Sequence, residues 1–296
     1  MSELLYLNGE FVPLAEGFVP IEDRGFQLGD GVYEVIKVMN GVPIWLSDHL
    51  ARLHRSLEAI RLTRILVDHD LDAVLPELVR RSGLIDGSIY LQVTRGAAPR
   101  EFVFPQPPHP TVLAYARAAH FPERDEILAG VVLHPVKDQR WARCDIKSTN
   151  LLASVLAKEE AREAGADEAL FLGPSGIVRE GGSSNVFAVL DGIVQTHPLS
   201  RRILGGVTRL HALEIAARLG YPVVERAFYL KEVIGPGNHC TEMFTASTTK
   251  DLLPITFIGG ARVGDGHPGP VTLALLEAMR AEQAALVGRE APAALT

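Results

Sequence analysis

Short runs rich in β-branched residues alternate along this chain with segments of helical period, and this alternation limits the folds open to it. Val32–Met39 alternates its side chains between two faces, as a strand does, whereas Leu46–Ile60 repeats leucine at helical spacing. The chain has 296 residues, of which 47% are hydrophobic, so it is long enough to bury two cores. The sequence therefore predicts an α/β (α+β) fold with a mostly antiparallel or mixed sheet.

The first part of the chain is predicted to form a small α/β domain. Asn8-Gly9 is a hairpin turn signal, and Ser47 is a suitable N-cap for the first long helix. The glycine-rich residues 22–31 have the composition of a surface loop. The predicted strands are Leu4–Asn8, Glu10–Val12, Val32–Met39, Ser88–Thr94 and Thr111–Ala116. The helix capped by Ser47 has its apolar residues at Leu46, Leu50, Leu53, Leu57 and Ile60, and a second helix covers about Asp70–Ser82 and is ended by Gly83.

Four prolines between residues 105 and 110, and the linker-like composition of Arg117–Glu126, divide the chain. We expect a small domain at residues 1–118, a linker at 119–125, and a larger α/β domain at 126–296 that carries Lys147. In the larger domain, a helix over Ser148–Glu163 is expected to turn Leu151, Leu152, Val155 and Leu156 toward the core. The other predicted elements are strands at Val131–Val136, Glu168–Leu172, Asn185–Leu190, Phe244–Ser247 and Ile255–Ile258, and helices at Thr208–Leu219 and Pro270–Leu286.

Charge and composition exclude several classes of protein. A net charge of −7 argues against a nucleic-acid binder, and no apolar run approaches the roughly 18 residues that a membrane span needs. Two cysteines, Cys144 and Cys240, and a start without a secretory pattern predict a cytoplasmic protein. His109, His120 and His134 lack the spacing of metal ligands, so no metal site is expected. The sequence also lacks a G-x-S-x-G elbow, which leaves a hydrolase little support.

Lysine is scarce, with six lysines against 23 arginines, and Lys147 has an unusual setting. It follows Ile146 at a predicted helix start, where the positive end of the helix dipole disfavours another positive charge. Partial burial there would lower the lysine pKa from about 10.4 toward the 7–8 that suits a nucleophilic amine. Position alone leaves a structural lysine as the alternative.

Other polar groups have both a functional and a plain interpretation. Tyr33, Val35 and Lys37 share one face of a strand, as in a pocket wall or at an edge strand with an exposed lysine. Arg95 and Arg100 lie on a glycine- and proline-bearing loop, where they either clamp an anion or are solvated. Arg52 flanks the apolar stripe of its helix, the usual place of a solvated arginine.

The second half adds three such segments. Glu180 is the first residue of the predicted turn Glu180–Asn185. Such a turn either places a carboxylate at the floor of a pocket or is an ordinary polar turn. Gly205-Gly206 leads into a helix, whose first N–H groups, with the Thr208 hydroxyl, suit a phosphate. Ser247, Thr248 and Thr249 supply three hydroxyls at a strand end.

Together these segments resemble the fold-type IV pyridoxal-phosphate enzymes, and most closely the D-amino acid transaminases among them. The resemblance covers nearly the whole chain, in blocks that follow one another in the family's order. The blocks are EDRGFQLGDGVYEVIKV (22–38), HLARL (49–53), IYLQVTRGAAPR (89–100), RWARCDIKSTNLLASVLAKEEA (140–161), EGGSSNVF (180–187), ILGGVTR (203–209) and ASTTKD (246–251).

The resemblance implies a two-domain enzyme with pyridoxal 5′-phosphate between the domains. Lys147 would bind the cofactor as a Schiff base and then act as acid and base, and Glu180 would pair with the pyridine nitrogen. The phosphate would be held by Arg52 and by groups from two further segments. The remaining cofactor-binding positions that the resemblance implies are Leu204 behind the ring, Val207, Thr208 and Thr248 at the phosphate, and Ser183 nearby.

The resemblance also implies how a substrate is held. In the D-amino acid enzymes of the family a tyrosine, an arginine and a histidine bind the substrate carboxylate, the last two from a loop of the partner subunit of a homodimer. Tyr33 and Arg100 match, but Phe102 stands at the histidine position. A lost hydrogen bond to a carboxylate costs about 1.5–3 kcal/mol, and the change would open the pocket to (R)-amines. Further substrate-side positions are Val35, Lys37, Ser247 and Thr249.

The reaction implied is a ping-pong transfer of an amino group from a D-amino acid to a 2-oxo acid, either 2-oxoglutarate or pyruvate. Two activities of the same fold are alternatives: a branched-chain L-amino acid aminotransferase and an aminodeoxychorismate lyase. The strand GVYEVIKV and the loop TRGAAPR favour the D-enzyme. A binding protein that kept the fold and lost the chemistry is a different alternative, which the presence of Lys147 and Glu180 opposes.

Overall fold

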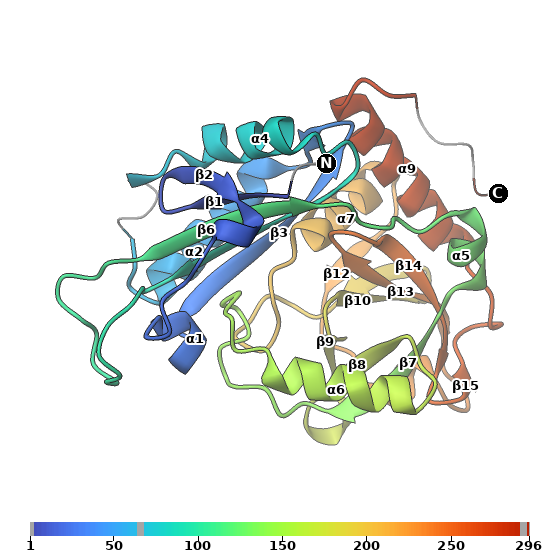
Figure 1. The fold of residues 1–296 in the computed structure, drawn as a ribbon. Coiled ribbons are helices and arrows are strands. Elements are labelled where there is room, and N and C mark those ends of the chain that lie inside the picture. The colour runs from blue at the N-terminus through green and yellow to red at the C-terminus, as the bar shows by residue number, and fades with distance from the viewer. Residues whose placement is uncertain (1–2, 64–67, 291–294, 296) are drawn as a thin grey trace. The chain divides into compact units, whose positions relative to one another are not determined.

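The computed structural model describes residues 3–63, 68–290 and 295. Its residue contacts divide the chain into two compact units (Figure 1). Unit 1 comprises Met1–His120 together with Ile146–Asn150, and unit 2 comprises Phe121–Asp145 together with Leu151–Thr296. None of the helices in the described residues is long and apolar enough to cross a membrane.

Unit 1 is built on a six-stranded sheet in the order β2-β1-β6-β5-β3-β4, in which every neighbouring pair is antiparallel. The hairpin signal at Asn8-Gly9 is confirmed, because it joins the first two strands. The long strands β3 and β5 pair along their whole length, from Gly31 opposite Thr94 to Val38 opposite Gly87. The strands are β1 (Leu4–Leu7), β2 (Glu10–Pro13), β3 (Gly31–Met39), β4 (Val42–Pro43), β5 (Gly87–Thr94) and β6 (Thr111–Arg117).

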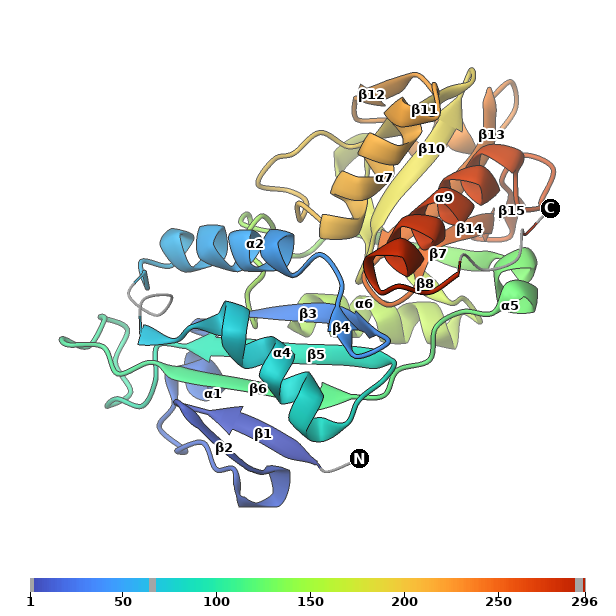
Figure 2. The same cartoon turned by 90° about the horizontal axis from the view of Figure 1, so that it is seen from above.

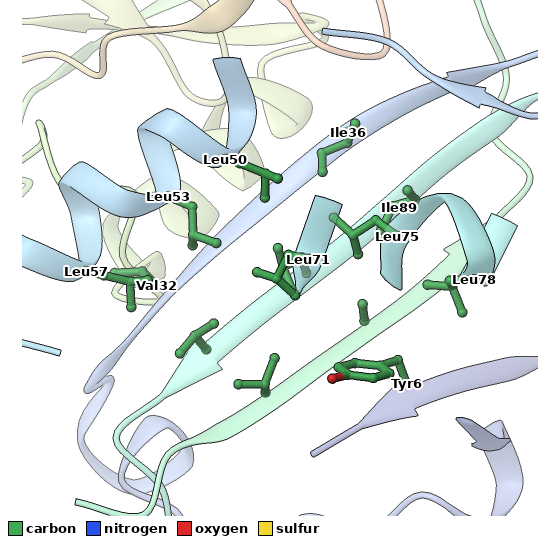
Figure 3. Packing of buried hydrophobic residues seen from close by; sticks show 14 of the residues in the cluster. Tyr6, Val32, Ile36, Leu50, Leu53, Leu57, Leu71, Leu75, Leu78 and Ile89 are labelled. Atoms are coloured by element: carbon green, nitrogen blue, oxygen red, sulfur yellow. The ribbon is translucent and has the colours of Figure 1, made fainter. Parts of the chain in front are cut away.

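Two helices, α2 (Leu46–Ala59) and α4 (Leu71–Ser82), pack on this sheet (Figure 2). Figure 3 shows leucines of both helices directed at the strands, where side chains such as Val32 and Ile36 meet them. This apolar layer is the core of unit 1, and its burial is the main driving force for the unit to fold. Gly83 ends α4 as predicted, and the helix begins at Leu71 because Asp70 is its N-cap, with the Asp70 side chain accepting from Ala73 N at 3.2 Å.

Two local predictions in unit 1 are wrong. The N-cap of α2 is Trp45, and no side chain caps that helix, so Ser47 does not have the predicted role. The expected loop at residues 22–31 contains a short helix, α1 (Arg24–Leu28), because the side chain of Asp23 accepts from Gly25 N at 2.8 Å and starts a turn. Gly29 ends α1 in the left-handed conformation.

Unit 2 is built on a mixed sheet in the order β12-β11-β10-β13-β14-β7-β8-β9, with β15 paired to β14. The pairs β11–β12, β14–β7 and β7–β8 are parallel and the others antiparallel, as the predicted mixed sheet requires. The strands are β7 (Val131–Lys137), β8 (Glu168–Leu172), β9 (Val178–Gly181), β10 (Asn185–Leu190), β11 (Ile193–Thr196), β12 (Val223–Glu225), β13 (Cys240–Ser247), β14 (Asp251–Ile258) and β15 (Ala261–Arg262).

Helices pack on both faces of this sheet (Figures 1 and 2). The helices α7 (Val207–Arg218) and α9 (Pro270–Leu286) pack against β13 or β14 and against each other, and α6 (Leu152–Glu163) packs against β7 and β8. Two short helices, α5 (Arg124–Ala129) and α8 (Leu230–Val233), complete the unit.

The face of α6 that meets the sheet differs from the prediction. Small residues, Ala157 and Ala161, pack against Phe171 of β8. The leucines and valine expected in the core are exposed, because alanines allow the helix to lie close to the strands on the opposite side. Their exposed fractions are 40% for Leu151, 71% for Leu152, 58% for Val155 and 62% for Leu156.

The segment Ile146–Asn150 is irregular, with one isolated bridge from Ser148 to Val32, and belongs to unit 1. Lys147 is therefore neither at a helix start nor grouped with the larger unit as expected. Its backbone pairs with β3: Tyr33 N donates to Lys147 O at 2.9 Å, and Thr149 N donates to Gly31 O at 3.0 Å. These bonds satisfy the backbone outside a helix, and α6 begins at Leu152 instead of Ser148. The helix-dipole argument for Lys147 therefore does not hold.

Candidate active site

Lys147 lies half-buried beside the first residues of β3. Its Nζ is 4.3 Å from the centroid of the Tyr33 ring, and its backbone N–H donates to Ser56 Oγ at 3.3 Å. Tyr33 in turn stacks on Tyr90 at 5.7 Å between ring centroids. An aromatic face favours a nearby ammonium group. The strand and the stacked rings therefore hold the lysine amine in a defined place.

The opposite face of β3 carries a buried charge cluster formed by Glu34, His49 and Arg52. Arg52 donates from Nε to Glu34 Oε1 at 2.8 Å and from its second terminal nitrogen to Oε2 at 2.6 Å. His49 Nδ1 lies 2.8 Å from Glu34 Oε2. The expectation of a solvated Arg52 is therefore wrong, because the side chain is paired with Glu34 and the residue is only 5% exposed.

Burial alone would raise the pKa of Glu34, but the charge and hydrogen bonds of Arg52, aided by His49, lower that pKa to about 2. Burial also lowers the pKa of His49, against the pull of Glu34, and the positive charges of Arg52 and Lys147 lower it further. Glu34 is therefore a carboxylate and His49 neutral at pH 7, which leaves Arg52 as a positioned cation.

Unit 2 holds a second buried carboxylate, Glu180 on β9. Its Oε2 accepts hydrogen bonds from Asn185 Nδ2 and from Leu204 N, both at 3.0 Å, and its Oε1 accepts from Arg140. Burial raises the pKa of Glu180, while the charge and hydrogen bond of Arg140 and the Leu204 N–H act in the opposite direction. Glu180 therefore lies at the end of β9, where the sequence predicted a turn, as a buried and oriented carboxylate.

The start of α7 is adapted for an anion. Its N-cap is Gly206, which provides no side-chain cap, so the first backbone N–H groups of the helix are not satisfied within it. A Cβ on Gly206 would lie 2.1 Å from Asn185 Oδ1, which explains why glycine is needed there. Val207 and Thr208 begin the helix and are each 4% exposed.

The remaining polar positions of unit 2 lie in two other turns. Ser247 ends β13, and Thr248 and Thr249 follow in the turn to β14, where all three are half-buried. Ser183 is exposed, accepts from Lys158 Nζ at 3.0 Å and donates to Glu168 Oε2 at 3.0 Å. The Ser183 side chain therefore contacts α6 and β8 and makes no hydrogen bond to Glu180.

A charged base supports the loop that carries Arg100 and Phe102. The guanidinium of Arg95 lies 3.6 Å from the centroid of the Phe104 ring and donates to Asp30. Arg24 donates both to Asp30 and to the backbone oxygen of residue 101. Arg100 itself is exposed, and Phe102 is 85% exposed. The base of the loop is thus anchored while its tip faces outward.

The structure brings the predicted residues into two sets. Unit 1 gathers Lys147, Tyr33 and Arg52 around β3, with Val35 half-buried and Lys37 buried on the Tyr33 face. Unit 2 gathers Glu180, Leu204, Val207 and Thr208 around Asn185, while Thr248 lies at the end of β13.

Three residues of these clusters escaped sequence reasoning: Glu34, His49 and Arg140. A usable signal existed for the first pair, because β-strand alternation places Glu34 on the apolar face with Ile36 and Val38, and an acidic residue there requires a partner. His49 and Arg52 are three residues apart on α2 and share a face of it. Arg140 has no comparable signal, since it lies in an irregular segment after β7.

Comparison with known proteins identifies the class. A family model described as amino-transferase class IV matches residues 31–258, and the chain belongs to that family. It is 41% identical over 265 residues to the D-alanine aminotransferase of Bacillus licheniformis, covering 90% of this chain and 92% of the relative. A D-alanine aminotransferase of Staphylococcus epidermidis RP62A is 39% identical over 269 residues, covering 90% and 93%.

Solved structures agree on the fold. The branched-chain aminotransferase of Thermoproteus uzoniensis with norvaline aligns with a TM-score of 0.82 and 29% identity, covering 98% of this chain and 96% of that one. The branched-chain amino acid aminotransferase of T.th. with pyridoxamine 5′-phosphate aligns with a TM-score of 0.87 and 28% identity, covering 98% and 96%. The family resemblance and the fold-type IV architecture are therefore confirmed, and the chain is a pyridoxal-phosphate-dependent aminotransferase.

The donor groups present fit this cofactor. An aldehyde requires an amine, which Lys147 has; a pyridine nitrogen requires a carboxylate, which Glu180 has. A phosphate dianion suits the Arg52 guanidinium, the uncapped start of α7 and a nearby hydroxyl. Among the described residues no cluster of histidine, cysteine, aspartate or glutamate is arranged to hold a metal ion.

Proposed function

We propose that this aminotransferase moves the amino group of a D-amino acid to a 2-oxo acid, 2-oxoglutarate or pyruvate, by a ping-pong mechanism. The observation that carries the proposal is the Lys147 amine, half-buried 4.3 Å from the centroid of the Tyr33 ring, in unit 1. The D-specific form is supported by the curated relatives at 41% and 39% identity, which are D-alanine aminotransferases. It agrees with the family resemblance, which assigns Tyr33 and Arg100 to binding of the substrate carboxylate.

Bound pyridoxal phosphate supplies an electron-withdrawing ring, which accepts the electron pair left when a substrate Cα proton departs. Lys147 Nζ would anchor the cofactor. It would then take up the proton from the substrate Cα and deliver it to the cofactor carbon that is bonded to the amino nitrogen. A neutral amine is needed to take up the proton, and the Tyr33 ring favours the ammonium group that results. The carboxylate of Glu180 holds the proton at the ring nitrogen.

Cofactor binding rests on the phosphate groups of the site. Arg52 is held by Glu34, so its guanidinium needs little reorganisation to meet an anion. The Val207 and Thr208 N–H groups, the Thr208 hydroxyl and Thr248 add uncharged donors. Leu204 backs the ring, and Ser183 supports the neighbouring turn. We propose that both sets of residues engage one cofactor molecule, placed between the two domains of the enzyme.

Substrate binding rests on Tyr33 and on Arg100, the second from the partner subunit. Phe102 replaces a donor to the carboxylate by an apolar ring, which weakens carboxylate binding and admits substrates that lack this group, such as (R)-amines. Val35 and Lys37 on β3, with Ser247 and Thr249 after β13, line the substrate side.

A homodimer follows from the loop and from α6. The loop tip with Arg100 and Phe102 faces outward. In the family's D-enzymes the corresponding loop binds the substrate of the partner subunit, and we assign the same role to this loop. The apolar face of α6, formed by Leu152, Val155 and Leu156, is mostly exposed in one chain, and such a face is a usual site of subunit contact. We place the enzyme in the cytoplasm, consistent with two free cysteines.

The alternatives are a branched-chain L-amino acid aminotransferase, an aminodeoxychorismate lyase and an inactive binding protein. The first is favoured only by structural neighbours below 30% identity. Initial rates with 2-oxoglutarate and either D-alanine or L-leucine separate it, since activity on L-leucine alone would reject the D-specific proposal.

The role of Lys147 has its own test. Lys147→Ala should remove both the visible absorption of the lysine-bound cofactor and turnover. Lys158→Ala, a change to an exposed lysine paired with Glu168, is the control and should keep both. Near-normal turnover of the first variant would assign the cofactor to another lysine, Lys37 first, and a wild-type protein that stays colourless with added cofactor would favour a binding protein.

A further inference from the structure

Arg140 occupies a position that the cofactor assignments leave unexplained. It follows β7 in an irregular segment, yet its side chain is only 11% exposed. One terminal nitrogen of its guanidinium donates to Glu180 Oε1. The two other oxygen contacts of Glu180 are uncharged donors, Asn185 and Leu204. Arg140 is therefore the one cation among the hydrogen-bond partners that the described residues give Glu180.

Asp138 fixes the guanidinium from the other side. Arg140 donates from Nε to Asp138 Oδ1 and from its other terminal nitrogen to Oδ2, both at 3.0 Å, and also to the Arg202 backbone oxygen at 3.2 Å. The guanidinium carbon lies 4.1 Å from the centroid of the Phe171 ring on β8. Two-point pairing and stacking hold an arginine in one plane, so Arg140 cannot swing away from Glu180 at small cost.

Asp138, Arg140 and Glu180 form a row of alternating charges. Asp138, Arg140 and Glu180 carry −1, +1 and −1, which sum to −1, the charge that balances one protonated ring nitrogen. If Arg140 were neutral, the buried carboxylate of Glu180 and the carboxylate of Asp138, which is 10% exposed, would lack a cation between them. A proton shared by Glu180 and the ring nitrogen would then move to the Glu180 carboxylate, nearer the negative charge of Asp138. If Asp138 were neutral, Arg140 would cancel Glu180 and the ring nitrogen would lose its proton more easily.

Other titratable groups near the row do not upset this balance. Arg179 on β9 is turned to His197, with its nitrogen 2.6 Å from Nε2, and burial lowers the pKa of that histidine. Burial raises the pKa of the Cys144 thiol to about 11, so the thiol stays neutral. Arg202 contributes its backbone oxygen to Arg140 and is itself exposed.

We propose that Arg140 and Asp138 are positioning residues that set the proton between Glu180 and the pyridine nitrogen of the cofactor. Arg140 keeps the proton on the ring side, and Asp138 keeps the carboxylate negative enough to retain it. The proposal deepens the proposed function and rests on its assignment of Glu180 to the ring nitrogen.

The holoenzyme loaded with pyridoxal phosphate labelled with ¹⁵N in the ring tests it, because the ¹⁵N chemical shift reports directly whether that nitrogen carries a proton. Wild type should show the protonated shift from pH 6 to pH 9. Arg140→Met should show the unprotonated shift at pH 7, and Arg140→Lys, which keeps the charge, should restore the protonated one. Asp138→Asn should lose the ring proton at a pH at least one unit lower, a tenfold change in the proton equilibrium.

Arg143→Met is the matched control, since Arg143 lies in the same segment and pairs in the same two-point way with Asp145. It should titrate like wild type. If Arg140→Met does not fold, as judged by its circular dichroism melt, Asp138→Asn decides. Wild-type titration in both Arg140→Met and Asp138→Asn would overturn the proposal. A wild-type signal in Glu180→Gln would instead reject the assignment of Glu180, and this separates failure of the proposed function from failure of the role of Arg140.

Discussion

Arg52 and Glu34 form a two-point ion pair in the interior of unit 1, with nitrogen–oxygen distances of 2.8 and 2.6 Å. One residue lies on α2 and the other on β3, so the pair fixes the helix to the strand that also carries Tyr33. A buried ion pair adds little net stability over apolar packing, but the loss of one partner leaves an uncompensated charge. We infer that the pair is kept for the positioned arginine it provides.

Glu34 should make the stability of the protein sensitive to acid. Its folded-state pKa is about 2, below the ordinary value of 4.5. A depressed carboxyl pKa contributes stability that is present above pH 4.5 and lost as the pH falls toward 2. At about 1.4 kcal/mol per pKa unit, the unfolding free energy should fall by about 3 kcal/mol across this window, and Glu34→Gln should lack that part of the slope in urea unfolding of the apoprotein.

A matched control distinguishes burial from simple pairing. The arginines Arg80 and Arg81 lower the pKa of Glu77 on α4 to about 2 as well, but that carboxylate lies at the protein surface. Exposed pairs are screened and contribute little. Glu77→Gln should therefore unfold with the same pH slope as wild type, whereas equal slopes for Glu34→Gln and wild type would contradict the role given to Glu34.

Phe102→His should strengthen carboxylate recognition. The change restores a donor at the position where the family's D-enzymes have histidine, and a hydrogen bond to a charged group contributes about 1.5–3 kcal/mol. We expect kcat/KM for D-alanine to rise about ten- to hundredfold, while that for (R)-1-phenylethylamine falls or stays level. Val103→His, one residue along the exposed tip, is the control, and an equal gain from both variants would reject a specific role for position 102.

Phe104→Ala should loosen the loop that carries Arg100. The ring of Phe104 lies 3.6 Å from the Arg95 guanidinium, a cation–π contact of about 0.5–2 kcal/mol. Its loss should raise KM for D-alanine several-fold and speed amide hydrogen exchange at residues 99–104, with kcat little changed. Phe18→Ala, at an exposed phenylalanine of the same unit, should change neither. Unchanged exchange in Phe104→Ala would show that the stacking does not anchor the loop.

Leu156→Glu should disrupt subunit association. The residue is 62% exposed within one chain and lies in the apolar face of α6, so a charge there would be buried in a dimer that uses this face. The molar mass from light scattering should fall from that of a dimer toward about half at micromolar concentration. Glu159→Lys, on the same helix in an exposed pair with Arg162, should remain dimeric. A dimer in both variants would place the contact elsewhere.

The sequence predicted the sheets and most helices because their signals are local. Strands such as Glu168–Leu172 and Asn185–Leu190 coincide with the prediction, as does the helix Pro270–Leu286. The start of α6 was wrong because backbone pairing of Ile146–Asn150 with β3 is a long-range contact that propensity cannot register. The face of α6 was wrong because leucine was assumed to be buried, and the packing side is set by alanines instead.

The residues of the candidate site also divide into those with a local sequence signal and those brought in by long-range contacts. Lys147, Glu180 and the glycines before α7 were predicted because each lies in a short motif. The partners Glu34 and Arg140 were missed because each pairs with a residue far away in the sequence. Glu34 is 18 residues from Arg52 and Arg140 is 40 residues from Glu180, so each pair meets only in the folded chain. The motifs thus indicate candidate reactive groups, and the fold shows which charged residues lie beside them.

One half-reaction tests the central claim most directly. The enzyme loaded with pyridoxal phosphate is mixed with D-alanine or with L-leucine, without a 2-oxo acid, and the visible cofactor band and the 2-oxo acid formed are measured together. We predict that D-alanine bleaches the band and releases one pyruvate per subunit, while L-leucine leaves the band in place. Bleaching by L-leucine with an inert D-alanine would contradict the assignment as a D-amino acid transaminase.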